Sequence, residues 1–352
     1  MQTTDEIREI REAHKLDMLA LESYLQGHVD ISGDLMIQQF SFGQSNPTYL
    51  LTAQDKAYVL RKKPPGKLLP SAHAVDREYR ILKALEKTDV PVPKMVLLCE
   101  DESILGTPFY VMEKVEGRIF RVPTLPDATG RKERFAIFDA MNETLVRVHK
   151  VDWQAAGLES FGKPGNYMAR QVGKWSKQYL ASQTDTINSM NHLMEWLPRN
   201  IPDDDSTTIV HGDFRLENMI LHPTEPKVVA VLDWELSTLG HPLADLAYNC
   251  MGYYLPSMGG RTFGYSDVDF AATGIPTEDA YTAAYCQRMQ RGDIPNWSFF
   301  MAFSMFRLAA IVQGVYRRGL DGNASAANAK TYGTYVQFLS DAGWNLVHPD
   351  AT

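Results

Sequence analysis

Short runs rich in β-branched and aromatic residues fill the first third of the chain and are separated by turn-forming clusters such as GQSNP. This pattern is typical of strands. The runs cover residues 36–42, 48–53, 56–62, 91–100 and 107–115. Apolar residues spaced by three and four predict two helices in the same part, one internal helix at 72–88 and one leading amphipathic helix at 5–25. Residues 1–115 therefore predict a small antiparallel β lobe.

After Gly117 the apolar spacing becomes mostly helical. The predicted helices cover residues 131–151, 166–182, 185–197, 277–291, 297–318 and 325–342. The fold class predicted is therefore α+β with two lobes: a β lobe at 1–115 and a larger, mainly helical lobe at 116–352, joined by a hinge near 112–117. A cleft between two such lobes is the natural place for a ligand.

One segment, residues 296–319, is almost apolar enough to cross a membrane. Arg307 lies in its middle, where a charge costs about 2.5–3.5 kcal/mol on insertion scales. No other segment of this kind accompanies it, so the pattern favours a buried central helix in a protein without a membrane anchor. Arg307 should then have a buried carboxylate partner.

The composition narrows the function classes. Apolar residues make up 44% and charged residues 22%, as in ordinary globular proteins. A net charge of −8 argues against a nucleic-acid binder. Three cysteines without CxxC spacing indicate neither a disulfide framework nor a zinc ribbon, and no signal peptide is recognisable. These features favour a cytoplasmic protein, and they leave the oligomeric state open.

The stretch from Met219 to Asp233 predicts a hairpin. Two apolar runs, 219–221 and 228–232, flank the sequence HPTEPK, whose prolines favour a turn. In such a hairpin Asn218 enters the first strand and Asp233 leaves the second, so both lie at its open end. One amide oxygen and one carboxylate form a suitable oxygen pair for Mg²⁺.

Asp213 precedes Asn218 by five residues, in the loop that leads to the same end of the hairpin. A carboxylate there can accept a proton from a substrate hydroxyl while the metal holds phosphate oxygens. The segment HGDFRLEN matches the protein-kinase pattern H-R-D-x-x-x-x-N with Gly212 in place of arginine, and LDWE replaces D-F-G. Aspartate and asparagine also serve ordinary turns, which is the competing interpretation.

These motifs together resemble those of the aminoglycoside phosphotransferase and choline kinase-like family, a branch of the protein-kinase fold. They are FGQSNPTYLL, YVLRKKPPGKLLPSAH, REYRIL, PFYVMEKVEG, HGDFRLEN, VLDWE and GHPLADLAY. More closely, the chain resembles the phosphotransferase domain fused ahead of acyl-CoA dehydrogenases in some larger proteins. The resemblance extends from about Leu35 to Arg318 and implies binding of ATP and Mg²⁺.

The resemblance also implies roles for individual residues. Asp213 corresponds to the catalytic base, and Arg215 to a basic residue near the transferred phosphate. Asn218 and Asp233 correspond to the Mg²⁺ ligands. The remaining counterparts are Glu78 as the internal-helix glutamate that pairs with the strand cation, Glu113 and Val115 as the hinge residues that bind adenine, and Asp245 as an acid that braces the catalytic loop.

Two positions depart from the family pattern. The strand cation should be lysine, but strand alternation places Arg61 on the face of Val59, with Lys62 opposite. Arginine can fork onto phosphate, and Lys62 or Lys63 remains an alternative. The phosphate loop FGQSNP carries one glycine, Gly43, with Ser45 and Asn46 as side-chain donors, and a plain hairpin turn explains it equally well.

The predicted function is an ATP- and Mg²⁺-dependent kinase for a hydroxyl of a small molecule. The resemblance implies a hydroxyacyl-CoA as acceptor; an aminoglycoside or another amino sugar or amino alcohol is the alternative. A pseudokinase that binds nucleotide without turnover, and a metal hydrolase built on His211 and Asp213, are the rivals from other classes. His211 is otherwise expected to pack and hydrogen-bond, and the glycine-rich residues 259–265 form either a lid or a simple loop.

Overall fold

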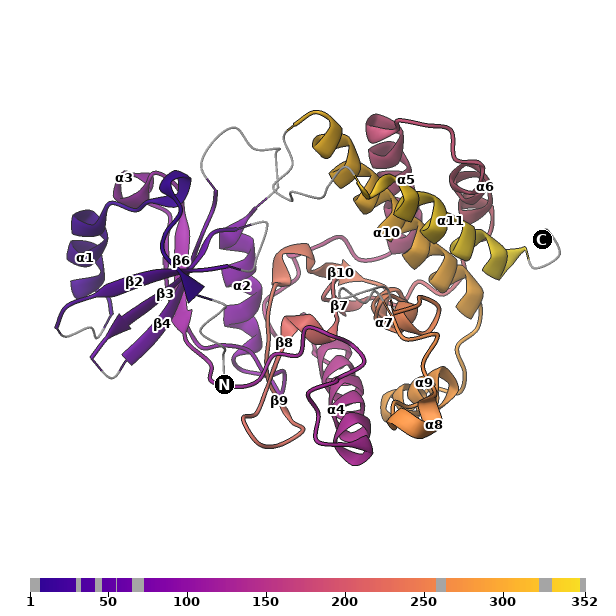
Figure 1. The fold of residues 1–352 in the computed structure, drawn as a ribbon, viewed down its shortest axis with the longest axis horizontal. Coiled ribbons are helices and arrows are strands. Elements are labelled where there is room, and N and C mark those ends of the chain that lie inside the picture. Colours follow the sequence, from indigo (N-terminus) through magenta and orange to yellow (C-terminus); the bar gives the residue numbers. More distant parts are fainter. Residues whose placement is uncertain are drawn as a thin grey trace. The chain divides into compact units, whose positions relative to one another are not determined.

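The structure is a computed structural model that describes residues 7–29, 33–41, 46–54, 56–64, 73–257, 264–322 and 331–348. The chain forms two compact units (Figure 1). Unit 1 comprises Met1–Phe120, Trp153–Phe161 and Leu216–Ser237, and unit 2 comprises the remaining segments. The first break therefore falls after Phe120, and two later segments pack with the N-terminal part.

Unit 1 contains a six-stranded antiparallel sheet in the order β1-β2-β3-β4-β6-β5. The strands are β1 (Ile7–Arg8), β2 (Met36–Phe40), β3 (Thr48–Ala53), β4 (Lys56–Lys62), β5 (Met95–Cys99) and β6 (Phe109–Glu113). Five of them coincide with the predicted runs, because those runs combine β-prone side chains with clear turn signals at both ends. The antiparallel sheet expected for this part is confirmed.

The two faces of this sheet are covered by different helices. One face packs with α1 (Met18–Gln26) and α3 (Glu102–Leu105) in a core that includes Leu21, Leu60 and Phe109. The predicted internal helix, α2 (Val75–Leu85), packs against β5 and β6. Since successive side chains of a strand point to opposite faces, Arg61 and Lys62 leave β4 in opposite directions.

The leading helix predicted at 5–25 is wrong over its first half. Ile7 and Arg8 pair with Phe40 and Gln39 as an edge strand, and a 3-10 turn follows at Glu12–His14. The helix begins only at Met18, where the Asp17 side chain accepts a hydrogen bond from the N–H of Ala20. The free backbone edge of β2 and this N-cap outweigh the apolar spacing of the first residues.

A two-stranded hairpin completes the described part of unit 1. Strands β8 (Met219–Leu221) and β9 (Val228–Val231) pair antiparallel, as predicted. Arg118 and Leu221 exchange both backbone hydrogen bonds at 2.8 Å, which ties the hairpin to the segment after β6. Gly117 allows this approach, since a Cβ there would lie 2.2 Å from the Leu221 carbonyl oxygen.

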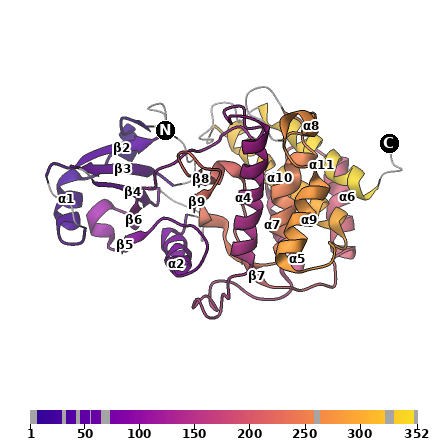
Figure 2. The same ribbon diagram turned by 90° about the horizontal axis from the view of Figure 1, so that it is seen from below.

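Unit 2 is mainly helical. Its helices are α4 (Arg131–His149), α5 (Tyr167–Ser182), α6 (Asn188–Trp196), α7 (Pro242–Cys250), α8 (Phe270–Thr273), α9 (Glu278–Met289), α10 (Trp297–Leu320) and α11 (Gly333–Val347). Strands β7 (Thr208–Val210) and β10 (Thr238–Gly240) form a short antiparallel pair. Helices α4 and α9 run side by side (Figure 2). The last helix starts later than predicted; residues 325–330 of that prediction lie outside the described part.

Helix α10 is the apolar segment that resembles a membrane span. It is the one described helix long and apolar enough to cross a bilayer, and 78% of that apolar window is buried inside the protein. The helix packs against α5, α7 and α11, which confirms the expected burial. The expected carboxylate partner of Arg307 is wrong: its guanidinium donates instead to the Gly212 carbonyl oxygen. A backbone carbonyl and aromatic rings solvate the charge in place of an acid.

Candidate active site

Arg61 is the centre of a charged cluster in unit 1. Its Nη1 lies 3.2 Å from Glu78 Oε1, and its Nη2 lies 2.6 Å from Asp233 Oδ1 and 3.6 Å from Glu235 Oε2. The forked guanidinium thus contacts α2 and the residues after β9 at the same time. Lys62 lies elsewhere, with its Nζ bonded to the Leu105 carbonyl oxygen. Arg61 is therefore the strand cation that pairs with Glu78.

Burial of this cluster and the charges within it shift the pKa values of both Glu78 and Arg61. Burial raises the pKa of Glu78 to about 7, further helped by the charges of Asp233 and Glu235 and opposed by Arg61. Burial lowers the pKa of Arg61, but the carboxylates of Glu78 and Asp233 outweigh it and hold that pKa well above its ordinary value. Glu78 is 1% exposed, so its charge depends on the guanidinium beside it.

Asn218 and Asp233 lie at the open end of the β8–β9 hairpin. The N–H of Leu232 donates to the Asn218 carbonyl oxygen at 2.8 Å, one step beyond the paired strands. Asp233 follows directly in the left-handed conformation, with φ 65°, an uncommon state for a residue other than glycine. The hairpin arrangement derived from the two apolar runs is therefore confirmed.

The predicted phosphate loop is described only at Asn46 and Pro47, because Gly43 and Ser45 lie outside the described residues. Asn46 Nδ2 donates to Glu235 Oε2 at 3.3 Å, and its Oδ1 lies 3.0 Å from the His73 ring. The sequence interpretation did not single out Glu235 or His73. The available signal for Glu235 was its position in LDWE, where it is a second acidic residue two positions after Asp233.

The predicted hinge residues follow the end of β6. The Glu113 N–H donates to the Lys94 carbonyl oxygen at 2.9 Å, and its side chain pairs with the Lys94 amine. Lys114 donates its N–H to Ala57, which continues the β4–β6 pairing by one residue. Val115 is the first hinge residue beyond this ladder, and binding of adenine by its backbone stays a prediction.

The loop before Asp213 in unit 2 is held by two buried charges. Asp245, 2% exposed on α7, accepts hydrogen bonds from the N–H groups of His211 and Gly212. Arg307 donates to the carbonyl oxygen of the same Gly212, whose φ is +86°. A residue with a side chain would be strained in that conformation. The bracing predicted for Asp245 is matched by its hydrogen bonds, whereas the role of Arg307 was not foreseen.

Asp213 itself is held by three neighbours. Its N–H donates to His211 Nδ1 at 3.1 Å, and Arg215 Nε lies 3.3 Å from its Oδ1. The Tyr248 hydroxyl also donates to the carboxylate; burial, together with that negative charge, raises the pKa of Tyr248. The Asp213 side chain remains 15% exposed. A carboxylate that is held in place and still accessible is suited to accept a proton.

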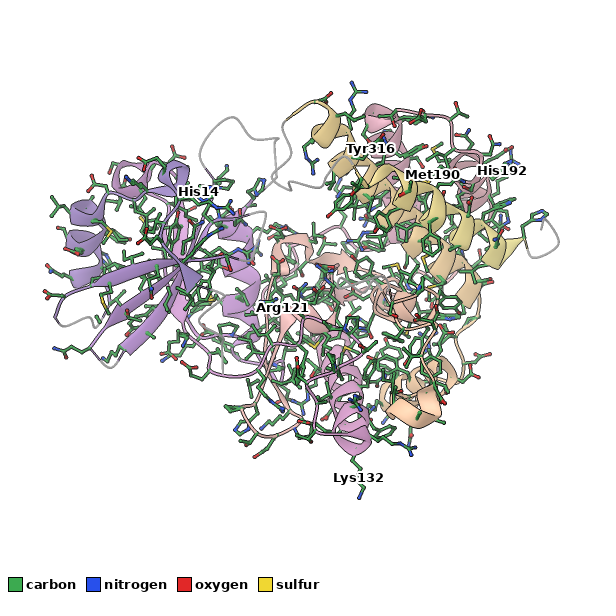
Figure 3. The ribbon with its side chains drawn as sticks, viewed as in Figure 1. His14, Arg121, Lys132, Met190, His192 and Tyr316 are labelled. Atoms are coloured by element: carbon green, nitrogen blue, oxygen red, sulfur yellow. The ribbon has the colours of Figure 1, made fainter. Side chains whose placement is uncertain are left out.

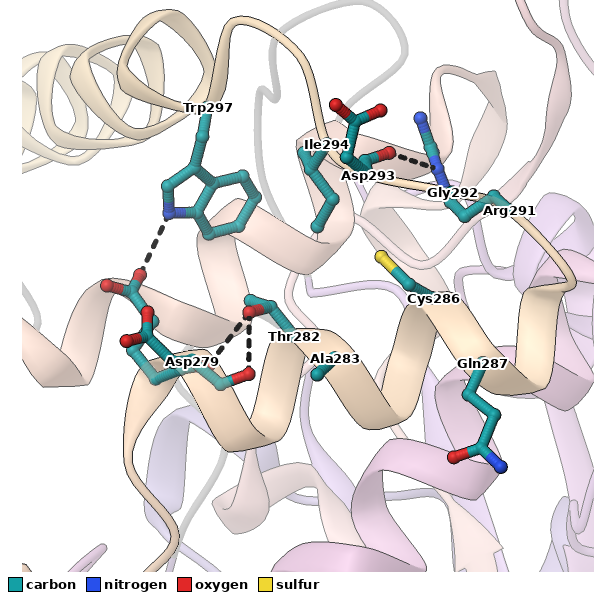
Figure 4. A pocket seen from close by; sticks show the side chains of 11 residues that line it. Asp279, Thr282, Ala283, Cys286, Gln287, Arg291, Gly292, Asp293, Ile294 and Trp297 are labelled. Atoms are coloured by element: carbon teal, nitrogen blue, oxygen red, sulfur yellow. Dashed lines mark hydrogen bonds between the residues drawn. The ribbon is translucent and has the colours of Figure 1, made fainter.

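A separate pocket lies along α9 and the segment leading to α10 (Figure 4). It has a volume of about 530 Å³, and Glu278, Cys286, Arg291 and Trp297 are among its lining residues. The Trp297 indole donates to Glu278 at 2.9 Å. None of the residues predicted for catalysis lines this pocket.

Comparison with known proteins bears on the family and the fold of this chain. A family model described as "Phosphotransferase enzyme family" matches residues 36–292. The chain belongs to this family. A candidate aminoglycoside phosphotransferase of Ralstonia eutropha is 46% identical, with a TM-score of 0.86 over 95% of this chain and 99% of that one. The chain is thus a member of the phosphotransferase family with a two-lobed, protein-kinase-like α+β fold.

More distant structures share the fold alone. A thermostable mutant aminoglycoside phosphotransferase, solved with AMP-PNP and hygromycin B, is 16% identical, with a TM-score of 0.62 over 95% of this chain and all of that one. Among curated relatives, acyl-CoA dehydrogenase family member 10 of Mus musculus is 50% identical over 96% of the chain, and human member 11 is 44% identical over 97%. The chain spans 32% and 44% of the lengths of these two relatives.

Proposed function

We propose that this phosphotransferase moves a phosphoryl group from ATP to a hydroxyl of a small molecule. The observation that carries the proposal is the buried Arg61 contacting both Glu78 and Asp233, because it joins the strand cation, the helix glutamate and the acid after β9. The protein-kinase template uses the same three parts. This pairing also supports an active kinase over a scaffold that binds nucleotide without turnover.

The residues fit a magnesium ion bound to a nucleotide. Asn218 and Asp233 offer hard oxygen donors from neighbouring ends of one hairpin, and Asp233 is 34% exposed. Magnesium is commonly held by one or two carboxylates, with phosphate oxygens and water completing its shell. When bound, it would neutralise the phosphate charge during transfer. Arg61, permanently charged, would bind phosphate oxygens of the nucleotide through its fork.

On the acceptor side, Asp213 would orient the hydroxyl and take up its proton. Tyr248 and His211 hold the orientation of Asp213, and Arg215 beside it would offer a positive charge to the transferred group. The described residues contain no group of three or more His, Cys, Asp or Glu side chains arranged for a metal, so nothing favours the metal-hydrolase rival.

A hydroxyacyl-CoA is the acceptor we propose. The curated relatives are named acyl-CoA dehydrogenase family members and match nearly the whole of this chain. The Ralstonia eutropha relative carries the aminoglycoside description, which makes an amino-sugar acceptor the second candidate. A screen that detects phosphorylated products by mass spectrometry, with hydroxyacyl-CoAs and aminoglycosides as arms, decides between them.

Replacing Asp213 tests the catalytic proposal. We expect Asp213→Ala to lower turnover by about 10²–10⁴-fold, which is the usual contribution of a general base. ADP affinity should be unchanged, since the proposed nucleotide contacts belong to other residues. Asp127→Ala, a change at an exposed aspartate of unit 2, is the matched control. Turnover of Asp213→Ala at the wild-type rate would refute the assignment.

A further inference from the structure

Helix α5 carries positive charge along one face. Residues 167–182 contain Arg170, Lys174 and Lys177 and no aspartate or glutamate. The spacing of four and then three places these side chains on the same side of the helix. Helix α10 packs beside α5 in unit 2 (Figure 1). Arg307 of α10 lies against Trp175 of α5. Four cations are thus supplied by two packed helices.

Arg307 is a buried cation with little compensation. It is 7% exposed, and its guanidinium carbon lies 5.4 Å from the Trp175 ring centroid and 4.8 Å from that of Tyr248. Its Nη2 donates to the Gly212 carbonyl oxygen, its Nε has no hydrogen-bond partner, and no ion pair among the described residues includes it. An uncompensated buried charge is costly, so this guanidinium is poised for an anion.

Lys174 places a second positive charge beside the Trp175 ring. Its Nζ lies 5.1 Å from the Trp175 ring centroid. Burial lowers the pKa of Lys174, and the charge of Arg307 lowers it further, with no acid acting in the opposite direction. Two like charges that share one aromatic ring, with no carboxylate of the described residues paired to either, create a local excess of positive charge.

We propose that Arg307 and Lys174 form a subsite that binds an anionic group of the acceptor, a carboxylate or a phosphate ester. This inference rests on the proposed kinase function. Arg307 also contacts Gly212, the residue before Asp213, so an anion held there lies beside the loop that faces the acceptor hydroxyl. Guanidinium and ammonium donors bind such oxyanions through strong charge-assisted hydrogen bonds. The acceptor is thus a hydroxylated anion, and a polycationic aminoglycoside is repelled.

Binding experiments on the 352-residue chain test the subsite without turnover. The nucleotide site is first saturated with Mg²⁺ and ADP, and tryptophan fluorescence then follows titration with coenzyme A, with 3-hydroxybutyrate and with hygromycin B. Trp175 lies against both cations and is the expected reporter. The coenzyme A arm reports a phosphate-ester group and the hydroxybutyrate arm a carboxylate. Tighter binding of hygromycin B than of both anions would overturn the proposal.

Charge variants make the test specific. We expect Lys174→Gln to weaken anion binding about tenfold and Arg307→Lys, which keeps the charge and loses the fork, several-fold. Lys132→Gln is the matched control, because Lys132 is exposed at the end of α4 and points away from the unit (Figure 3). Most of the Lys174 side chain is accessible, although its ammonium group is partly desolvated beside Trp175, so its variant should remain folded. Unchanged affinity in Lys174→Gln would overturn the subsite.

The outcomes separate this inference from the kinase proposal. Asp213→Ala should bind the anions as well as the wild type does, because the subsite does not include Asp213. Charge-dependent anion binding without phosphorylation of any acceptor would support the subsite and contradict the kinase. Phosphorylation of an anionic acceptor with the same KM in wild type and Lys174→Gln would support the kinase and contradict the subsite.

Discussion

Arg61 stands where the resemblance predicts a lysine, and its chemistry explains why arginine suits the position. One Nη reaches Glu78 and the other reaches Asp233, at 3.2 and 2.6 Å. An ammonium is a single point charge and could not span the two carboxylates in this way. Strand alternation had already separated Arg61 from Lys62, but only the packed helix α2 showed which of the two faces Glu78.

Removing the guanidinium should destabilise unit 1 in a pH-dependent manner. We expect Arg61→Met to lower the free energy of unfolding by about 3–5 kcal/mol at pH 8, because Glu78 is left buried without the cation that balances its charge. The pKa of Glu78 is raised in the folded state, so the stability it contributes is present at low pH and lost as pH rises through that pKa. The decrease in the free energy of unfolding caused by Arg61→Met should therefore be smaller at pH 6 than at pH 8.

Urea unfolding of Arg61→Met at pH 6 and pH 8 measures this effect. The double variant Arg61→Met with Glu78→Gln is the control and should remove the difference between the two pH values. An equal loss of stability for Arg61→Met at both pH values would show that Glu78 does not carry the effect.

At the scale of elements, the β8–β9 hairpin determines where Asn218 and Asp233 lie. Strand β8 is tied to Arg118 by two backbone hydrogen bonds at Leu221, and Gly117 lies against the carbonyl oxygen of Leu221. The hairpin position therefore depends on a glycine about a hundred residues earlier in the sequence. A residue that is not itself a proposed ligand-binding residue can thus determine the positions of the proposed metal ligands, Asn218 and Asp233.

A methyl group at this contact should disturb the hairpin. We expect Gly117→Ala to lower the free energy of unfolding by about 1–3 kcal/mol, because the added Cβ would lie 2.2 Å from a backbone oxygen that must move. Magnesium-dependent nucleotide binding should weaken as well. Gly173→Ala is the control: nothing lies within 4 Å of its Cβ position in α5, so it should be neutral or stabilising by up to about 1 kcal/mol. Wild-type stability of Gly117→Ala would contradict this account.

At the scale of the whole molecule, the proposed catalytic residues are divided between the two units. Arg61, Glu78, Asn218 and Asp233 belong to unit 1, whereas Asp213, Arg215 and Arg307 belong to unit 2. The chain passes from one unit to the other between Arg215 and Leu216, within the HGDFRLEN motif itself. The motif therefore joins the acceptor residues to the metal ligands by covalent connection.

This division predicts how ligands stabilise the protein. A ligand at one hundred times its Kd should add about 2.7 kcal/mol to the free energy of unfolding, so Mg²⁺ with ADP should raise the Tm. Asp233→Asn should lose the magnesium-dependent part of this rise, whereas Asp213→Ala should keep it. Thermal unfolding with ADP, in Mg²⁺ or in EDTA, measures the shift. A rise that does not depend on magnesium would contradict the roles of Asn218 and Asp233.

Local patterns in the sequence determined much of this protein. Alternation and turn residues sufficed for the sheet, because each strand's faces and ends are marked by its own side chains. The prolines of HPTEPK and the flanking apolar runs sufficed for the hairpin and hence for the pairing of Asn218 with Asp233. Motif spacing predicts Asp213 as the base, since a short loop has few ways to present a carboxylate.

Tertiary structure decided what depends on partners far away in the sequence. The first residues form an edge strand rather than a helix because β2 offers an unpaired backbone. Arg307 binds the Gly212 carbonyl and aromatic rings rather than a carboxylate because α5 and α7 pack beside α10. The charge on residue 307 is a property of the sequence. Its surroundings come from packing between helices, where burial and distance, rather than local propensity, determine the free energy.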